Sequence, residues 1–204
     1  MREFHDVQQG TDEWQALRCG KATASNFGLF MANDGKAFGE PAQRYALQIA
    51  LERLNGRKAE VGFSNDHMQR GTEQEPVARM LYEQQTFTDV DNGGFFDCGE
   101  YGDSPDGLIG DDGLIEIKAV IAPTHRATQR RGSFDPAYRW QLVGHLDCTG
   151  RAWVDFISYC SEFPEHSQLL VYRLHREEVA DELERLAARR TEFLEYVRKE
   201  MTTI

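Results

Sequence analysis

The sequence predicts one α/β (α+β) domain in which a central mixed β-sheet is flanked by helices. Hydrophobic residues recur at helical spacing early in the chain and again near its end, whereas the period shortens to that of strands after residue 86. Helices are followed by three strands, a helix, two strands and a final helix. Antiparallel strands extended by a helical crossover give a mixed sheet. We expect residues 1–204 to form a single domain with an N-terminal helical elaboration.

Capping residues and turn signals place the individual elements. Thr11 or Asp12 is suited to begin the first helix, and a short second helix follows Ser25. Two longer helices are expected at 41–55 and 66–85. The later elements are, in order, a meander of strands at 87–90, 94–97 and 114–120, a helix at 135–149, strands at 153–159 and 168–174, and a charged helix with one buried stripe at 177–201.

The composition indicates a folded domain without a membrane segment. Of the 204 residues, 40% are hydrophobic and 28% are charged, and polar residues interrupt the longer apolar stretches. The first residues lack the apolar core of a signal peptide, so we expect a cytoplasmic protein. The four cysteines are scattered without a CxxC pair, which favours free thiols over a zinc or iron-sulfur site.

The charged residues are unevenly distributed. Lys and Arg number 23 against 34 Asp and Glu, a net charge of -11 that argues against non-specific binding to nucleic acid. From Asp91 to Glu116 there are eight acidic residues and no Lys or Arg. From 123 to 151, in contrast, five arginines stand against two aspartates. The first segment is suited to hold a cation and the second to hold a polyanion.

The segment 104–118 carries the residues best suited to catalysis. In a strand alternate side chains share a face, so Glu116 and Lys118 project together while Ile115 and Ile117 face the core. If Asp106 ends the preceding strand, its carboxylate can meet that of Glu116, and two such oxygen donors suit Mg2+. Lys118 could then orient the water that attacks a phosphodiester.

The same residues also have an ordinary structural interpretation. Asp106-Gly107 and Asp111-Asp112-Gly113 have the composition of tight turns. Glu116 and Lys118 would in that case be an exposed pattern of opposite charges on the sheet surface. The short motif alone does not decide between the two interpretations.

Five ordered blocks give the segment a wider context. They are Gln9-Gly10-Thr11-Asp12-Glu13-Trp14 leading to Leu17-Arg18 and Thr23-Ala24-Ser25, then Gly71-Thr72-Glu73-Gln74-Glu75-Pro76, Ser104-Pro105-Asp106-Gly107, Glu116-Ile117-Lys118 and Tyr138-Arg139-Trp140-Gln141. Together they resemble the phage lambda exonuclease family of viral recombination nucleases, which belongs to the restriction-endonuclease-like PD-(D/E)xK superfamily. The resemblance covers most of the chain, and the order of the blocks makes it specific.

The resemblance implies the roles of the central residues. Asp106 and Glu116 would be metal ligands, joined by the backbone carbonyl of Ile117, and Lys118 would position or deprotonate the nucleophilic water. Glu75 would approach the metal from the helical layer. Alternatively, Glu75 closes a capping box with a Thr three residues before it.

Flanking residues are implied to hold the DNA. Arg18 and Ser25 resemble the family's phosphate-binding pair, and a guanidinium with a hydroxyl makes a sensible anion site. Their ordinary alternatives are a surface salt bridge for Arg18 and a helix cap for Ser25. Tyr138 and Gln141 share a helical face, where Gln141 would contact the water or the phosphate and Tyr138 would support it or pack in the core. A candidate DNA track is formed by Arg126, Arg130, Arg131 and Arg139. No histidine is assigned a role.

The function implied by the resemblance is a Mg2+-dependent exonuclease, with Mn2+ able to substitute. It would resect linear double-stranded DNA from the 5' end and leave a 3' single strand for recombination by annealing. The implied partners are DNA ends, further copies of the chain in a ring-shaped trimer, and a single-strand annealing protein. A phage or prophage protein acting in a bacterial host is the implied source. An endonuclease of the same fold and a non-catalytic DNA-binding relative remain as alternatives.

Overall fold

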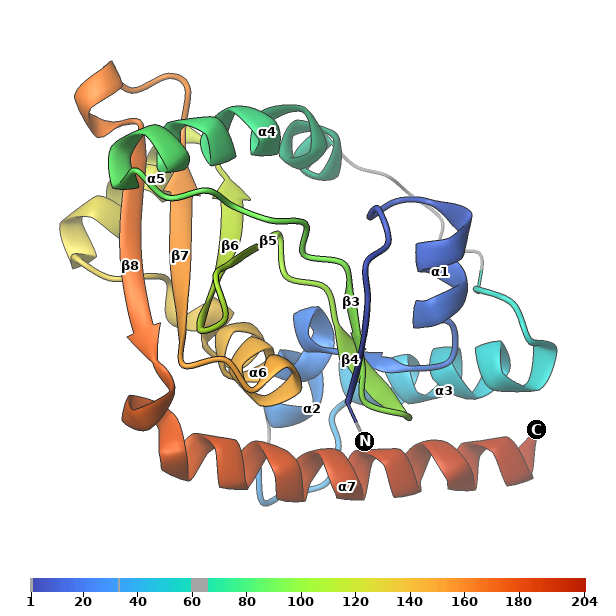
Figure 1. The fold of residues 1–204 in the computed structure, drawn as a ribbon. Helices are drawn as coiled ribbons and strands as arrows, with labels where there is room; N and C mark the ends of the chain where they lie inside the picture. The colour runs from blue at the N-terminus through green and yellow to red at the C-terminus, as the bar shows by residue number, and fades with distance from the viewer. Residues whose placement is uncertain (1, 33, 60–65) are drawn as a thin grey trace.

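The computed structural model describes residues 2–32, 34–59 and 66–204, with the backbone alone for 66–72. The strands form two four-stranded mixed sheets with helices around them (Figure 1). The helices are α1 Asp12–Arg18, α2 Phe27–Met31, α3 Glu40–Asn55, α4 Asp66–Thr86, α5 Ala122–Arg131, α6 Arg139–Thr149 and α7 Ala180–Thr203. The strands are β1 Glu3–His5, β2 Ala22–Thr23, β3 Phe95–Asp97, β4 Tyr101–Asp103, β5 Gly107–Ile109, β6 Gly113–Ala119, β7 Trp153–Tyr159 and β8 Leu169–His175.

The larger sheet has the order β5-β6-β7-β8, and both of its faces are covered. Strands β6 and β7 run parallel, while β5 and β8 pair with them antiparallel at the two edges. Helix α4 packs on one face, where its Ala78 and Tyr82 join the isoleucines of β6 in a small core. Helix α6 lies on the opposite face, where Leu142 and Leu146 contribute to the main core. Strand β6 is therefore enclosed between two helices.

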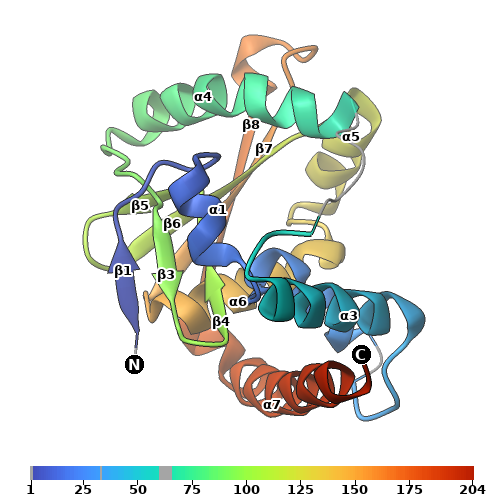
Figure 2. The same cartoon turned by 90° about the vertical axis from the view of Figure 1, so that its right-hand side faces the viewer.

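The smaller sheet, in the order β1-β3-β4-β2, links the N-terminal segment to the middle of the chain. The parallel partner of β4 is β2, and β4 leads directly into the segment 104–106. Helices α3 and α7 pack together; in Figure 2, α3 lies beside the lower end of this sheet and α7 lies beneath it. The buried stripe predicted for the last helix is present, since Leu186, Phe193 and Val197 of α7 are fully buried. Through β1 and β2 the N-terminal segment thus packs beside the strand that leads into residues 104–106.

The predicted class of fold is confirmed, but several elements are wrong or missing. The strands divide between two sheets instead of one central sheet, and residues 87–90 form no strand. Phe87 instead has a positive φ of 55° and lies almost wholly exposed at the end of α4. The predicted meander also omitted two strands that the structure contains, β4 and β5, each of which is only three residues long. The sequence prediction omitted α5, β1 and β2 as well.

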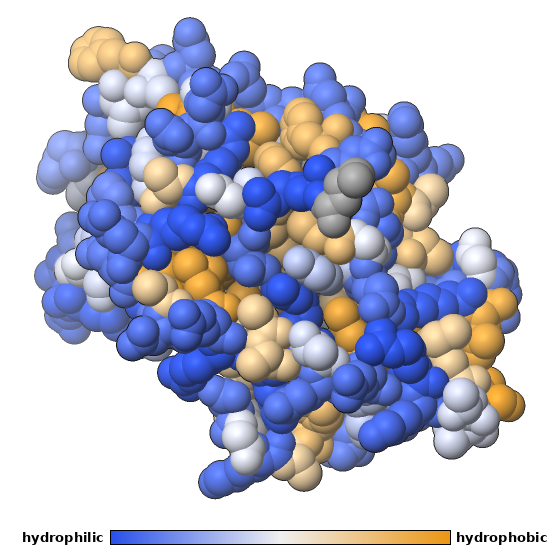
Figure 3. Space-filling view, turned by 60° about the horizontal axis from the view of Figure 1, so that its bottom comes forward, coloured by the Kyte–Doolittle hydropathy of each residue, from blue (hydrophilic) through white to orange (hydrophobic). Residues whose placement is uncertain are grey.

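The surface reflects the high content of charged residues. On the face that brings α7 forward, hydrophilic residues cover most of the area and hydrophobic residues show in separate groups (Figure 3). Across the described residues, none of the helices combines the length and the apolar character that a membrane crossing requires.

Candidate active site

Strand β6 presents its two charged side chains to the interior of the domain. Glu116 is only 2% exposed, and its Oε1 forms an ion pair with Nζ of Lys118. Ile115 and Ile117 point to the other face, against α4. The predicted alternation is confirmed. The interpretation of Glu116 and Lys118 as an exposed charge pattern is wrong, because Glu116 is buried. A buried carboxylate needs partners to offset its loss of contact with water, and Lys118 is one of them.

Asp106 lies beside Glu116, although not where the sequence pattern suggested. It does not end a hairpin strand or occupy a tight turn; it immediately precedes β5, which pairs antiparallel with β6. Its N–H donates to the carbonyl of Ile115 at 3.2 Å, and its Oδ2 accepts from the N–H of Ile117 at 2.6 Å. Burial and the nearby charges of Glu116 and Glu75 raise the pKa of Asp106 well above its usual range.

Glu75 approaches the same group of carboxylates from α4. Burial and the charge of Glu116 raise the pKa of Glu75, while Lys118 acts to lower it. The capping-box alternative is wrong, because α4 runs without a break from residue 66 to residue 86 and Glu75 lies well inside it. The side chain of Thr72, the other half of that capping box, lies outside the described residues.

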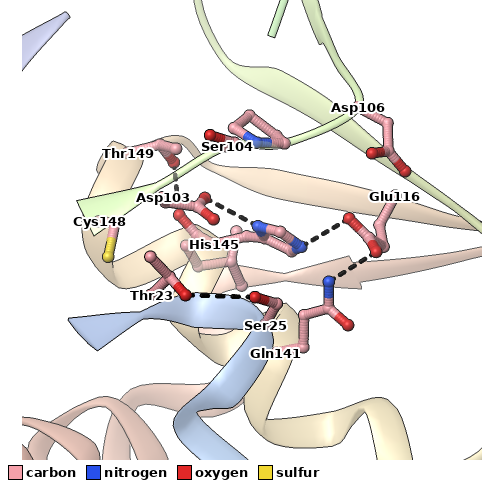
Figure 4. A network of polar contacts seen from close by, with 12 residues as sticks. Thr23, Ser25, Asp103, Ser104, Asp106, Glu116, Gln141, His145, Cys148 and Thr149 are labelled. Carbon is pink, nitrogen blue, oxygen red and sulfur yellow. Dashed lines mark hydrogen bonds and ion pairs between the residues drawn. The ribbon is translucent and has the colours of Figure 1, made fainter. Parts of the chain in front are cut away.

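Helix α6 supplies the remaining contacts of Glu116. Nε2 of Gln141 donates to Oε1 of Glu116 at 2.6 Å, and Nε2 of His145 lies 2.9 Å from Oε2 (Figure 4). Nδ1 of the same His145 ring lies 2.7 Å from Oδ2 of Asp103 at the end of β4. His145 was assigned no role from the sequence. The available signal was its spacing, since residues four apart on a helix share a face and Gln141 was already a candidate.

The partners of Glu116 determine the charge of the cluster. Burial opposes the ionisation of Glu116, but Lys118 and His145 outweigh it and lower the pKa of Glu116 to about 2. Burial likewise disfavours the charged ring of His145, yet the carboxylates of Asp103 and Glu116 raise its pKa to about 10. The pKa of Lys118 is raised for the same reason, since Glu116 and Asp106 outweigh burial. Both cations are therefore charged at neutral pH.

Tyr138 packs in the core, which is the second of its two predicted roles. It lies in the short 3-10 helix Pro136–Tyr138 that leads into α6, and its ring packs on Phe156 with the centroids 5.2 Å apart. Nζ of Lys118 lies 5.4 Å from the centre of the same ring. The aromatic ring thus belongs to the core and also borders the site.

Residues of the first sequence block support the segment that carries Asp106. Nε2 of Gln9 donates to the carbonyl of Pro105 at 2.7 Å, and Nε1 of Trp14 donates to Oγ of Ser104 at 2.8 Å. The backbone of Gly93 approaches so closely that a Cβ atom would lie 1.7 Å from the Pro105 carbonyl oxygen. Only glycine fits there. The segment 104–106 is therefore fixed from two sides.

Arg18 also contacts this segment. Its Nη1 donates to Oγ of Ser104 at 3.2 Å, and its guanidinium lies 4.2 Å from the centre of the Trp14 ring. Burial lowers the pKa of Arg18. No ion pair with a carboxylate is found for it among the described residues, so the surface salt bridge is wrong. Ser104, which the sequence analysis quoted without giving it a role, is the hydroxyl partner of Arg18.

Ser25 lies in the adjacent 3-10 helix Ala24–Asn26, and the position before that helix belongs to Thr23, so the helix-cap alternative for Ser25 is wrong. Ser25 is exposed, and its Oγ lies 3.3 Å from Oγ1 of Thr23. The N–H of Thr23 donates to the hydroxyl of Tyr45 at 2.9 Å. Burial raises the pKa of Tyr45, while the charge of Arg18 acts to lower it. Tyr45, seen in the sequence only as a helical hydrophobic, therefore supports the backbone beside Ser25.

The predicted arginine track is only partly available. Arg126, Arg130 and Arg131 are exposed on α5, where Arg126 contacts Gln129 and Arg131 pairs with Asp135 at 3.3 Å. Arg139, at the start of α6, is held by two hydrogen bonds of 2.8 and 2.9 Å to Glu182 of α7. Arg139 thus joins two helices, whereas α5 presents the other three to solvent.

Comparison with known proteins places this arrangement in a family. Residues 13–152 match the YqaJ-like viral recombinase domain, while the curated proteins contain no significant match. The alkaline exonuclease LHK-Exo from Laribacter hongkongensis is 36% identical with a TM-score of 0.78, and the match covers 93% of this chain and 95% of that one. The complex of LHK-Exo with dAMP gives the same identity and coverage with a TM-score of 0.80.

A more distant structure shares the fold. A phage related exonuclease from Haemophilus somnus 129PT has a TM-score of 0.67 at 12% identity, over 90% of this chain and 96% of that one. The extent of the domain match and the identity to LHK-Exo agree with the resemblance to the lambda exonuclease family. This chain belongs to the family of YqaJ-like viral recombinases.

Proposed function

We propose that this protein is a Mg2+-dependent nuclease that resects linear double-stranded DNA in the 5'-to-3' direction. The resulting 3' single strand would serve recombination by annealing. The observation that carries the proposal is the meeting of Asp106, Glu116, Lys118 and Gln141 at one buried site. The exonuclease named LHK-Exo, 36% identical over nearly the whole chain, supports the same class of reaction.

The donors present fit a divalent cation. Asp106 and Glu116 provide carboxylate oxygens, and the Ile117 carbonyl lies on the strand between Glu116 and Lys118. Burial raises the pKa of Asp106, and repulsion from Glu116 and Glu75 raises it further; a cation would relieve that repulsion. Within the described residues no group of three His, Cys, Asp or Glu side chains is arranged to hold a metal ion. The proposed site therefore relies on Asp106 and Glu116, and Mg2+ is often held by one or two carboxylates together with waters and substrate phosphates.

The remaining residues would act on the water and the phosphate. A bound Mg2+, or Mn2+ in its place, would lower the pKa of a water and stabilise charge on the phosphate oxygens. Lys118 is charged, with its ammonium between Glu116 and the Tyr138 ring. It is therefore suited to orient the water and to offset negative charge on the phosphate. The amide of Gln141 fixes the same carboxylate oxygen that Lys118 contacts.

The 5' polarity depends on Arg18. A partly buried guanidinium that has a hydroxyl partner and, among the described residues, no carboxylate pair can accept a phosphate without first breaking a salt bridge. Ser104 lies two residues before Asp106, so a terminal phosphate at Arg18 would lie next to the metal site. Ser25, which is exposed and contacts the hydroxyl of Thr23, would complete the anchor.

The proposal includes a closed homo-oligomer, a ring of three that surrounds the duplex and acts with a single-strand annealing protein. The net charge of -11 is compatible with DNA only if the duplex meets a local basic surface. The exposed arginines of α5 supply one, and a ring would keep the enzyme on its substrate. The protein would act in the cytoplasm of the bacterial host of a phage or prophage. Light scattering at several concentrations tests the assembly, and a monomer would refute the ring.

Linear and circular plasmids, incubated with and without Mg2+, test the proposed reaction. Linear duplex should be degraded only with metal, and an end label should be lost from the 5' strand before the 3' strand. Circular plasmid should remain intact. Cutting of the circle would instead indicate an endonuclease, and DNA binding without cutting would indicate a non-catalytic relative.

A further inference from the structure

His145 occupies a position that the proposed reaction does not itself require. Its ring is 1% exposed and lies between two carboxylates, Asp103 and Glu116, which are each 2% exposed. Each ring nitrogen lies within 2.9 Å of one carboxylate oxygen. Figure 4 shows the three side chains in a row, from the end of β4 through α6 to β6. A buried imidazole is rarely bracketed in this way unless both contacts matter, because two buried carboxylates are costly.

The contacts of Glu116 divide between its two oxygens. Oε1 receives Gln141 and Lys118, whereas Oε2 faces Nε2 of His145. The ring therefore opposes rotation of the carboxylate about its terminal bond. For a group that must present a lone pair in one direction, control of this rotation determines how well the group can ligate a metal.

Asp103 in turn holds the ring. Among the described residues, His145 is the one side chain at hydrogen-bond or ion-pair distance from the Asp103 carboxylate. The contact with Asp103 fixes both the position and the orientation of the imidazole. Such a carboxylate behind a histidine is a common way to orient the ring.

We propose that Asp103 and His145 form a positioning pair that holds Glu116 in the orientation needed to bind a divalent cation. The pair does not touch the substrate, and it acts through Glu116 alone. The inference rests on the proposed function, because it takes Glu116 as a metal ligand. This positioning role of His145 differs from a role in packing, because any polar side chain of similar size could fill the same space.

Two amide variants separate positioning from packing. In His145→Gln the amide nitrogen can take the place of Nε2 and still donate to Glu116. In His145→Asn the amide can reach only the side of Asp103. We expect His145→Asn to weaken Mn2+ binding to the DNA-free protein by about 10- to 100-fold, as loss of a supporting residue does elsewhere. His145→Gln should retain most of the affinity, and titration calorimetry measures both.

A second buried histidine provides the control. His125 is 0% exposed, but its ring contacts Oγ of Ser158 at 2.8 Å and the carbonyl of Ser167 at 2.9 Å, and no carboxylate among the described side chains pairs with it. His125→Gln should therefore leave the Mn2+ affinity unchanged. An equal loss in His125→Gln would mean that general loosening of the core causes the effect, and the inference would fail.

Two further variants make the outcome decisive. Asp103→Asn should also weaken Mn2+ binding, because the ring of His145 loses the carboxylate that orients it. If circular dichroism shows that His145→Asn does not fold, Asp103→Asn tests the positioning pair in its place. Wild-type affinity in folded His145→Asn or Asp103→Asn would overturn the positioning pair. Glu116→Gln tests the proposed function separately: if it too binds Mn2+ normally, the metal site is elsewhere. In the nuclease assay, the Mg2+ concentration for half-maximal rate should rise in His145→Asn while the KM for DNA stays constant.

Discussion

Arg18 donates a hydrogen bond to Ser104 at 3.2 Å, and Ser104 is separated from Asp106 by Pro105 alone. The guanidinium that we propose binds a DNA end and the carboxylate that we propose binds a metal are thus fixed to one short segment. Proline limits the backbone of that segment, and Gln9 anchors its carbonyl. The distance between the bound DNA end and the phosphodiester that is cut would then be set by this rigid segment and not by a flexible loop.

Arg18→Lys should reduce the preference for 5'-phosphorylated over 5'-hydroxyl ends by about 10-fold or more, the equivalent of one hydrogen bond to a charged group. Lysine keeps the charge but loses the planar fork that recognises phosphate. Rates on the two kinds of end measure the effect. Arg198→Lys, at an exposed arginine of α7 paired with Glu100, is the control and should keep the preference. Equal rates on both ends in the wild type would remove the basis of this prediction.

Asp106→Asn and Glu116→Gln should each reduce Mg2+-dependent cleavage by more than the factor of about 10 to 100 that loss of a supporting residue costs. Each change removes a charged oxygen donor but keeps the shape. Asp111→Asn, at an exposed carboxylate in the turn between β5 and β6, should cut normally. Activity that survives in the two site variants, or that persists in a chelator, would contradict the metal site.

Lys118→Met should lower turnover by about 100- to 10,000-fold, the range for loss of a group that assists proton transfer. Methionine keeps an unbranched apolar stem beside the Tyr138 ring and removes only the ammonium, so DNA binding in Ca2+ should persist. Single-turnover cleavage and gel-shift assays separate the two properties. Lys199→Met on α7 is a matched exposed lysine. A Lys118 variant that fails to bind DNA would show that the lysine holds substrate instead.

His145→Leu should lower the free energy of unfolding of the metal-free protein at pH 7 by about 3–5 kcal/mol, because it removes the charged ring that pairs with the buried Asp103 carboxylate and with one oxygen of the buried Glu116. The pKa of His145 in the folded state is about 10, above the ordinary value near 6.5. The stabilisation by the charged ring is therefore complete below about pH 6.5 and is lost as the pH rises through 10. Urea unfolding in chelator should show that the difference in the free energy of unfolding between wild type and variant becomes smaller from pH 7 to pH 10. A difference that grows over this range would show that the His145 ring is not charged in the folded protein.

Arg130→Gln should weaken binding of duplex DNA and reduce the slope of log affinity against log salt by about 0.9, the value for one phosphate contact. Arg130 is exposed on α5, and no ion pair is found for it in the described part of the chain. Arg139→Gln, in contrast, breaks the bidentate pair with Glu182, so its main effect should be on thermal stability. Fluorescence anisotropy across salt concentrations compares the two, and an unchanged slope in Arg130→Gln would exclude α5 from the DNA surface.

The sequence predicted the residues with local signals and missed those defined by distant contacts. The alternation of β6 and the helical spacing of Tyr138 and Gln141 are periodic patterns, so their faces could be assigned. Ser104 and His145 acquire their importance from partners 86 to 90 and 42 residues away. Such pairings depend on how the two sheets and α6 meet, which periodicity does not specify.

The fold shows the same division. Long elements with caps, such as α3 and α7, were placed correctly because their signals repeat over several turns. Strands β1, β2, β4 and β5 have two or three residues each, too few for a period to emerge. They exist because neighbouring backbone supplies their hydrogen bonds, as β4 does for β2. Asp106-Gly107 was read as a turn because Asp and Gly favour turns, whereas Gly107 begins β5.

The enclosure of β6 between α4 and α6 restricts how related sequences can change in length. A shift of the strand by one residue would move Glu116 and Lys118 into the apolar layer under α4 and turn Ile115 and Ile117 toward α6. Insertion or deletion of one residue within β6 is thus incompatible with both the core and the site. Length differences between homologues should fall in the β5–β6 turn or beyond Ala119, where they leave the pleat in phase, and an alignment of relatives can be checked for that restriction.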